Sequence, residues 1–482
     1  MTSPTAGTAT IDAHRPPSEG AAVEQAPTRA LVSWVMFDWA AQPYYTLVLT
    51  FLFAPYFATA VVGDAARGQT MWGYAAALAG IAVAIGSPLL GAMADGRGRR
   101  KPWIALFSVL LVAGLSLLWL AEPGASTATV VLVLFGFVLA TIAAEFTQVF
   151  TNAIMPGLVP ADKLGRLSGI GWAVGYTGGL ISLALVAGLI VTDPTTGKTI
   201  LGLDPLVKLD TPAREGDRLV GPLTAAWFAL FMIPFFLFVP DARPPVTAAS
   251  LQRRSALAEL WDTLSALPSH KDMMYFLLAR MLYTDGLSAI FAFGGIYGAA
   301  VFGWQAMELG IFGIILTITG IIGAVIGGVL DDRVGPKTVI LWALAILLVG
   351  AFGILSVDKT HVLFGMDVEP KAAGSAPFSS IGERVFLAFA MVIGIVSAPV
   401  QAASRSLLAR LAPPEKITQF FGLFAFSGKV TAFLAPLTIA SVTAATGSQR
   451  AGMAAVALFL ISGMILMLLV KSPRAAKQPV AR

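Results

Sequence analysis

The sequence predicts an all-α membrane protein with twelve transmembrane helices arranged as two bundles of six. Three observations predict it. Of the 482 residues, 57% are hydrophobic and only 12% are charged. The apolar residues gather in long runs, and short motifs recur in the two halves of the chain. A soluble domain carries about 25% charged residues, so this composition excludes a cytosolic enzyme and, outside the chain ends, intrinsic disorder.

Each apolar run is long enough to cross a bilayer as a helix, which takes about 20 residues. Strands of a membrane barrel would instead alternate apolar and polar residues over about ten positions. The runs lie at residues 31–62, 71–93, 102–121, 127–156, 164–191, 221–239, 272–302, 306–330, 338–357, 383–409, 417–446 and 450–470. The absence of cysteine also excludes disulfides and thiolate metal sites.

The distribution of lysine and arginine predicts the orientation. An even number of crossings puts both ends of the chain on one side, together with the loops that follow every second run. That side carries more Lys and Arg than Asp and Glu, whereas the other side carries fewer. The positive-inside rule makes the first side cytoplasmic. We therefore expect cytoplasmic tails at 1–30, disordered, and at 472–482, in a bacterial plasma (inner) membrane.

Two motifs repeat between the halves of the chain. GAMADGRGRRK at 91–101 matches GVLDDRVGPK at 328–337, and each follows the second helix of its half. The segment at 159–169 similarly matches the segment at 412–422. The halves therefore have the same orientation.

We expect one bundle at 31–240 and the other at 272–471. The linker at 241–271 has helical spacing and is expected to lie along the cytoplasmic surface, where it connects the halves.

The repeated loop resembles the signature of the major facilitator superfamily, G-x-x-x-D-R-x-G-R-R between helices 2 and 3. Asp95 and the segment Gly98-Arg99-Arg100 fit this signature, whereas Gly96 replaces the usual arginine. Asp332-Arg333 restores the Asp-Arg pair in the second copy. Two copies, each after the second helix of its half, make the resemblance specific.

A narrower resemblance covers most of the membrane region. SWVMFDWAAQPYYTLVLTFLFAPYF at 33–57 and FFGLFAFSGKVTAFLAPL at 420–437 are similar to the vacuole-effluxer-like branch of that superfamily. The resemblance implies secondary active transport of a small molecule by alternating access, with a central site between the bundles. Fungal relatives are associated with vacuolar amino-acid efflux, so the resemblance implies an amino acid as one candidate solute. We expect the protein to be a monomer.

Six charged residues fall inside predicted spans: Asp38, Glu145, Arg280, Asp285, Arg405 and Lys429. Each costs about 2.5–3.5 kcal/mol at a helix centre on insertion scales, so such residues usually face a polar cavity or a partner. Glu145, Asp285 and Lys429 lie near the middles of their helices, and the other three lie toward the cytoplasmic ends. A permanent ion pair and a transport role are both open interpretations of these charges.

Uncharged polar residues share helix faces with these charges. They are Gln42, Tyr45, Gln148, Asn152 and Gln401. The polar faces predict the lining of a cavity. Hydrogen bonds between neighbouring helices, which would only fix their packing, explain the same residues.

The repeated loops predict gates on the cytoplasmic side. The first loop contains Asp95, Arg99 and Arg100, and the second contains Asp332, Arg333 and Lys337. We expect each aspartate either to cap a helix N-terminus or to pair with a cytoplasmic arginine, which would hold that side closed.

Small residues recur at every fourth position on two helices. Helix 5 carries Gly171, Gly175 and Gly179, and helix 8 carries Gly323 and Gly327. Such spacing predicts close helix approach. Rocking of the two bundles and ordinary packing within a bundle explain it equally well.

A zwitterionic solute, as the family resemblance implies, needs a cation for its carboxylate and an anion for its amine. We hypothesise that Lys429 meets the carboxylate, while Glu145 or Asp285 meets the amine or carries a coupling proton. Asp38 is a further candidate for the proton, since His14, His270 and His361 all lie outside the spans.

Other chemistry is missing from the sequence. It contains no Walker loop and no metal-binding motif. We therefore expect no cofactor, no metal, no nucleic-acid partner and no enzymatic activity; the expected partners are the solute, a coupling proton and the bilayer. The alternatives left open are a transporter-shaped receptor or scaffold without flux, and an exporter of a drug-like compound or a sugar.

Overall fold

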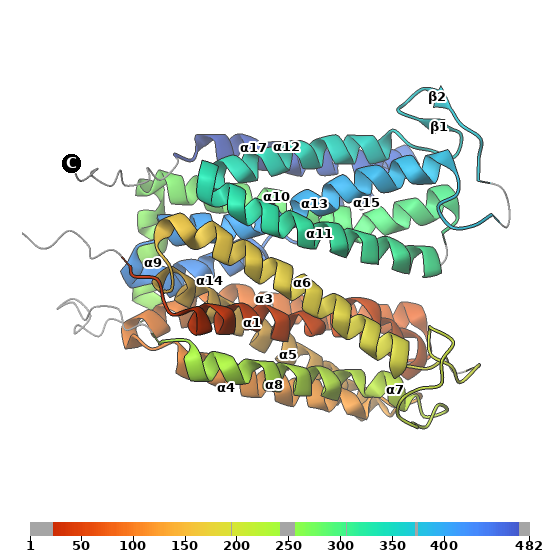
Figure 1. Cartoon of the computed structure of the whole chain (residues 1–482), viewed down its shortest axis with the longest axis horizontal. Coiled ribbons are helices and arrows are strands. Elements are labelled where there is room, and N and C mark those ends of the chain that lie inside the picture. The colour runs from red at the N-terminus through yellow and green to blue at the C-terminus, as the bar shows by residue number, and fades with distance from the viewer. Residues whose placement is uncertain (1–22, 194, 242–255, 305, 372–374, 472–482) are drawn as a thin grey trace, which may run out of the picture.

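The computed structural model describes residues 23–193, 195–241, 256–304, 306–371 and 375–471. In Figure 1 the long helices run side by side along the longest axis, with α1 to α8 forming one group and α10 to α17 the other. Eleven helices of the described chain are long and apolar enough to cross a membrane. This confirms the predicted polytopic all-α class.

The first half of the chain contains eight α-helices and several short π- or 3₁₀-helical turns. In order they are α1 (Thr28–Pro43), η1 (Tyr44–Phe51), α2 (Phe53–Tyr56), η2 (Phe57–Val61), α3 (Ala65–Arg97), α4 (Lys101–Leu117), η3 (Leu118–Leu120), α5 (Thr127–Ile154), η4 (Met155–Gly157), η5 (Ala161–Lys163), α6 (Leu164–Leu189), α7 (Glu215–Arg218) and α8 (Val220–Phe238).

The linker and second half contain the remaining elements. They are α9 (Ala256–Ala266), η7 (Leu267–Ser269), α10 (Lys271–Phe302), α11 (Ala306–Val334), α12 (Pro336–Leu355), β1 (His361–Val362), β2 (Met366–Asp367), α13 (Ile381–Leu411), η8 (Pro414–Lys416), α14 (Ile417–Ser427), α15 (Leu434–Thr446), α16 (Gln449–Ala454) and α17 (Val456–Leu469).

The prediction of one continuous helix across 417–446 is wrong. α14 ends at Ser427, α15 begins at Leu434, and residues 428–433 form turns between them. Gly428 begins the break, and glycine is a weak helix former. Pro436 lies in the first turn of α15, where its missing N–H costs no hydrogen bond. The eleventh predicted crossing is therefore a pair of short helices, which explains why eleven rather than twelve continuous spans are found in the described chain.

The first crossing is also irregular. Pro43 lies inside α1, and the backbone continues from Tyr44 as the π-helix η1. A proline removes a backbone donor from the helical ladder, and π-helical turns are often found at functional sites.

The two ends of the helices are clearly distinguishable in Figure 1. The linker helix α9 lies at one end, and the small hairpin of β1 and β2 lies at the other. We refer to these as the α9 end and the hairpin end.

The contact between the bundles depends on glycines of α6 and α11, which lie side by side (Figure 1). A Cβ added to Gly169 would lie 2.4 Å from the carbonyl oxygen of Ala324, on the other bundle. By contrast, one added to Gly175 would meet Asp38, and one added to Gly323 would meet Ile395, both within the same bundle. For Gly175 and Gly323, packing within a bundle therefore fits better than a role in rocking of the two bundles.

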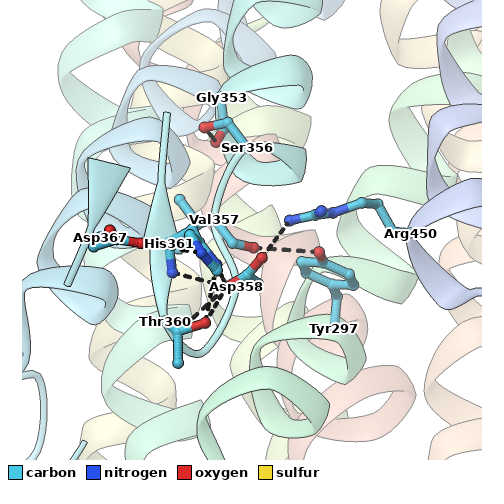
Figure 2. Close-up of polar contacts among 9 residues, drawn as sticks. All are labelled: Tyr297, Gly353, Ser356, Val357, Asp358, Thr360, His361, Asp367 and Arg450. Atoms are coloured by element: carbon cyan, nitrogen blue, oxygen red, sulfur yellow. Dashed lines mark hydrogen bonds and ion pairs between the residues drawn. The ribbon is translucent and has the colours of Figure 1, made fainter. Parts of the chain in front are cut away.

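A polar cluster holds the loop after α12 at the hairpin end (Figure 2). Asp358 accepts hydrogen bonds from the backbone N–H groups of Thr360 (2.9 Å) and His361 (2.8 Å). Its other oxygen lies 3.3 Å from Nη2 of Arg450, and the hydroxyl of Tyr297 donates to the carbonyl of Val357. Burial raises the pKa of Asp358, but the hydrogen bonds from Thr360 and His361 outweigh it and lower the pKa to about 2.

Candidate functional site

A cavity of about 850 Å³ lies between the two bundles. Helices of the first half (α1, η1, α5 and α6) and of the second half (α10, α11, α13 and α14) contribute to its lining. Its lining includes Asp38, Gln42, Tyr45, Glu145, Gln148, Asn152, Arg280, Gln401, Arg405 and Lys429. The structure thus brings together ten of the residues that the sequence suggests, because their helix faces converge.

Glu145 and Lys429 form an ion pair across the cavity. Nζ of Lys429 lies 2.8 Å from Oε1 of Glu145. Glu145 belongs to the regular helix α5 of the first bundle, whereas Lys429 lies in the break between α14 and α15 of the second. The break therefore places a mid-membrane cation within reach of the opposite bundle.

Arg405 joins the bundles on the α9 side of the cavity. Its Nη1 contacts Oδ2 of Asp38 at 3.3 Å and donates to Oδ1 of Asn152 at 3.2 Å. Its Nε and Nη2 donate to the hydroxyl (2.8 Å) and carbonyl (2.7 Å) oxygens of Ser168, and its guanidinium lies 5.1 Å from the ring centre of Trp34. Every one of these partners belongs to the first bundle.

Arg280 is held against the C-terminal end of α14. Its guanidinium lies 3.4 Å from the ring centre of Phe424. Nη1 donates to the carbonyl of Phe424 and, at 2.8 Å, to the hydroxyl of Ser427. These contacts leave Arg280 half-buried at the cavity wall.

Asp285 lies outside the cavity lining, unlike the other five intramembrane charges. Its side chain is buried, and Oδ2 finds no hydrogen-bond donor among the described residues. Thr431, in the break after α14, lies beside this carboxylate.

Other lining residues form hydrogen bonds or ring contacts with one another along the cavity wall. Gln148 donates to Asn152 at 3.1 Å along α5. Gln401 donates to the carbonyl of Ser397 within α13. Trp172 and Tyr176 of α6 also line the cavity, in edge-to-face contact with each other.

Asp95 closes the α9 end by capping α14. Its two oxygens accept hydrogen bonds from the backbone N–H groups of Thr418 (3.2 Å) and Gln419 (2.9 Å) at the start of that helix. Arg100 links the same two segments, since its Nε donates to the hydroxyl of Thr418 at 2.7 Å and its Nη2 lies 3.3 Å from Asp95. A carboxylate at this position also complements the positive end of the helix dipole.

Asp332 makes the equivalent contact in the other direction. Its Oδ1 accepts a hydrogen bond at 3.1 Å from the backbone N–H of Arg166, in the first turn of α6. The guanidinium of Arg166 lies 3.6 Å from the same carboxylate. Each repeated loop therefore caps a helix of the opposite bundle.

The other residues of these loops behave differently. Arg99 and Arg333 are exposed, and Lys337 donates to the carbonyl of Leu468 within its own bundle. The sequence did not single out Asp331, which is buried, accepts a hydrogen bond from Ser406 and lies 2.9 Å from Nη2 of Arg410.

Sequence reasoning also missed Ser168, Trp34 and Phe424. A tandem aspartate at the end of an apolar helix was the available signal for Asp331. The other three carry no signal in one sequence, since serine and aromatic residues are common in membrane helices.

The cavity is directed toward the hairpin end. Its lining extends from Arg405 to Thr50 and Phe51 of η1 and to Leu309 of α11, which lie nearer that end. The contacts of Arg405, Asp95 and Asp332 close the opposite side. Near the hairpin end, the ring of Phe51 of the first bundle lies beside Gly313 of α11, and both residues line the cavity.

Comparison with known proteins agrees with this architecture. Residues 59–479 match the sequence profile of a family described as vacuole effluxer Atg22 like. This chain belongs to that family.

Two relatives illustrate the range of the Atg22-like family. An uncharacterised MFS-type transporter, YxiO of Bacillus subtilis strain 168, is 24% identical over 450 residues, covering 90% of this chain and 93% of YxiO. Autophagy-related protein 22-1 of Neosartorya fischeri is 25% identical over 329 residues, covering 66% of this chain and 49% of the fungal protein. The chain thus spans about half the length of the fungal relatives that it matches.

Solved structures share the fold. The major facilitator superfamily transporter FucP in its outward conformation superposes with a TM-score of 0.66 at 15% identity, covering 92% of this chain and 99% of FucP. A bacterial homologue of the iron transporter ferroportin, in an outward-facing state, gives a TM-score of 0.58 at 15% identity, covering 92% and 97%. This Atg22-like protein is therefore a membrane transporter with the major facilitator fold.

Proposed function

We propose that this Atg22-like protein is a secondary active transporter that moves a small polar solute by alternating access. The central cavity carries this proposal. It lies between two bundles of like orientation, both contribute charged lining residues, and cross-bundle contacts close one side of it. Rocking of the two halves about such a site exposes it to each side in turn.

The excess of lysine and arginine supports placing the α9 end in the cytoplasm of a bacterial plasma membrane. In that orientation, the cavity of this structure faces outward. The Asp95 and Asp332 caps then act as cytoplasmic gates, which must open when the protein faces inward.

An amino acid is the solute that we propose. The cavity volume of about 850 Å³ lies in the range of about 300–1,000 Å³ that is usual for small-molecule sites. The lining carries carboxylates on the first bundle, Asp38 and Glu145, and cations on the second, Arg280, Arg405 and Lys429. A cavity with negative charges on one bundle and positive charges on the other suits a zwitterion better than an uncharged sugar.

We propose Asp285 as the carrier of a coupling proton. Asp38 and Glu145 already have cationic partners, whereas Asp285 has a buried oxygen without a donor among the described residues. An ionised carboxylate without a donor is costly to bury, so this residue is the one placed to change protonation during the cycle. Thr431 connects it to the break between α14 and α15.

Flux into proteoliposomes tests the transport function. Purified protein would be reconstituted into vesicles, and radiolabelled amino acids and sugars would be added outside them, with and without a pH gradient. Protein-free vesicles serve as the control. Uptake of amino acids that rises with the gradient is expected. A receptor or scaffold would bind a compound from the panel yet give no flux with any gradient, and that result would overturn the proposal.

A further inference from the structure

The charges that line the cavity do not balance within the wall itself. The lining residues of the described chain include two carboxylates, Asp38 and Glu145, and three cations, Arg280, Arg405 and Lys429. Glu145 is paired with Lys429 and Asp38 with Arg405. One cation, Arg280, forms no ion pair with any residue that the structure describes.

This pairing changes which cation is available to a solute. Lys429, which the sequence suggests as the carboxylate-binding residue, already has a carboxylate at 2.8 Å. A solute would have to displace Glu145 before it could bind there. Arg405 is buried, and all three of its guanidinium nitrogens contact Asp38, Asn152 or Ser168.

Arg280 is preorganised by its own surroundings. The Phe424 ring stacks against the guanidinium at 3.4 Å, and Nη1 is fixed by the carbonyl of Phe424 and the hydroxyl of Ser427. Gly428 leaves the space that the guanidinium occupies, because a Cβ there would lie 2.9 Å from Nη1. A fixed guanidinium loses little conformational entropy when it binds a ligand.

Part of the guanidinium remains available. An arginine side chain has five N–H donors, and both hydrogen bonds described for Arg280 use Nη1. The half-buried side chain lines the cavity with the rest. Two parallel N–H donors match the two oxygens of a carboxylate.

Asp285, on the same helix, is the rival partner for Arg280. Its side chain is 2% exposed, lies outside the cavity lining and makes no ion pair with Arg280. A second rival is that Arg280 only caps the carbonyls of α14. Capping accounts for Nη1 but not for the placement of the side chain at the cavity wall.

We propose that Arg280 binds the carboxylate of the transported solute, and that the protein therefore selects solutes with a free carboxylate. The proposal rests on the transport function proposed above and narrows its substrate class. It assigns the carboxylate to the second bundle, beside the break after α14, and leaves Glu145–Lys429 as a contact between the bundles.

Binding to matched pairs of compounds tests this assignment. The purified full-length protein would be titrated with L-leucine and L-leucinamide, with L-alanine and L-alaninamide, and with glucose. Thermal shift and tryptophan fluorescence report binding, since Trp172 lines the cavity. We expect each acid to bind at least about tenfold more tightly than its amide, because the amide leaves the Arg280 guanidinium without an anionic partner.

Variants of Arg280 separate binding from folding. Arg280→Gln is expected to abolish the preference for the acid. Arg280→Lys keeps the positive charge next to α14 but loses the two parallel N–H donors of the guanidinium. This variant should fold with near-normal thermal stability, and its preference for the acid over the amide should be reduced about tenfold. Arg384→Gln, which removes an exposed arginine at the hairpin end, is the matched control and should keep the preference.

Two different failures are distinguishable. If acids and amides bind equally, or if folded Arg280→Lys and Arg280→Gln keep the wild-type preference, the assignment is overturned while transport stands. If the wild-type protein neither binds nor transports any acid, amide or sugar of the panel, the proposed function is overturned, and this assignment with it.

Discussion

Nζ of Lys429 lies 2.8 Å from Oε1 of Glu145, and this ion pair joins the two bundles at the central cavity. The two residues differ in their backbone setting, since Glu145 is in the regular helix α5 and Lys429 is in the turns between α14 and α15. The pair therefore couples a rigid element of one bundle to an irregular element of the other. A movement of the break would change their distance directly.

Breaking this pair from one side should impair transport more than removing both charges. Lys429→Met leaves Glu145 without a cation, and Glu145→Gln leaves Lys429 without an anion, so each is expected to reduce flux at least about tenfold. The double variant removes both unpaired charges and should recover most of the flux in proteoliposomes. A double variant as inactive as Lys429→Met would show that the lysine acts on the solute itself.

Neutralising the gate aspartates should open the α9 end. Asp95→Asn and Asp332→Asn each weaken an N-cap, a change that costs about 0.5–2 kcal/mol and shifts a two-state population about two- to thirtyfold. The chain has no cysteine, so Ala409→Cys supplies a single thiol, buried at the α9 end of α13. We expect faster maleimide labelling of this thiol and lower flux in both variants.

Asp64→Asn provides the matched control for the gate experiment. Asp64 caps α3 by accepting from Arg67 N–H within one bundle, at the opposite end. The Asp64→Asn variant should leave the maleimide labelling of the Ala409→Cys thiol unchanged. Equal labelling of Asp95→Asn and the parent Ala409→Cys protein would refute the gate role.

Two glycines of α11 should respond oppositely to the same substitution. A Cβ added to Gly323 would lie 1.7 Å from the carbonyl oxygen of Ile395, whereas one added to Gly310 meets nothing within 4 Å. Gly323→Ala is expected to destabilise the protein by about 1–3 kcal/mol through overpacking. Gly310→Ala should be neutral or stabilising, since alanine is the better helix former. Melting temperatures in detergent check this, and equal values for the two variants would contradict the close contact of α11 with α13.

The loop cluster in Figure 2 should depend on pH through Asp358. Its folded-state pKa of about 2 lies below the ordinary value of about 3.9, so its contribution to stability is present above pH 4 and is lost as the pH falls through about 2. Asp358→Asn should lower the melting temperature at pH 7, and its difference from wild type should shrink between pH 4 and pH 2. Glu369→Gln, at an exposed carboxylate of the same loop that makes none of the contacts drawn in Figure 2, is the control. A difference that stays constant with pH would mean that the charge does not hold the loop.

Local properties of the sequence were sufficient to predict most of the architecture. Apolar runs of sufficient length specify membrane helices wherever they occur, and lysine and arginine bias the loops without reference to distant residues. Helical periodicity alone placed Glu145, Gln148 and Asn152 on one face, and the structure has all three in the cavity wall. The repeated aspartates Asp95 and Asp332 were likewise visible as two copies of one loop.

Only the tertiary structure decided which of these residues meet. The break at 428–433 is invisible to hydropathy, because Val430, Ala432 and Phe433 are as apolar as a helix requires. Lys429 pairs with Glu145, and Arg405 pairs with Asp38. Asp285 lies outside the cavity lining. These outcomes depend on how helices far apart in the sequence approach one another. Membrane insertion and helix formation depend mainly on the composition of each segment. Ion pairs and cavity walls depend on packing between segments. A single sequence therefore records the helices far more directly than the contacts between them.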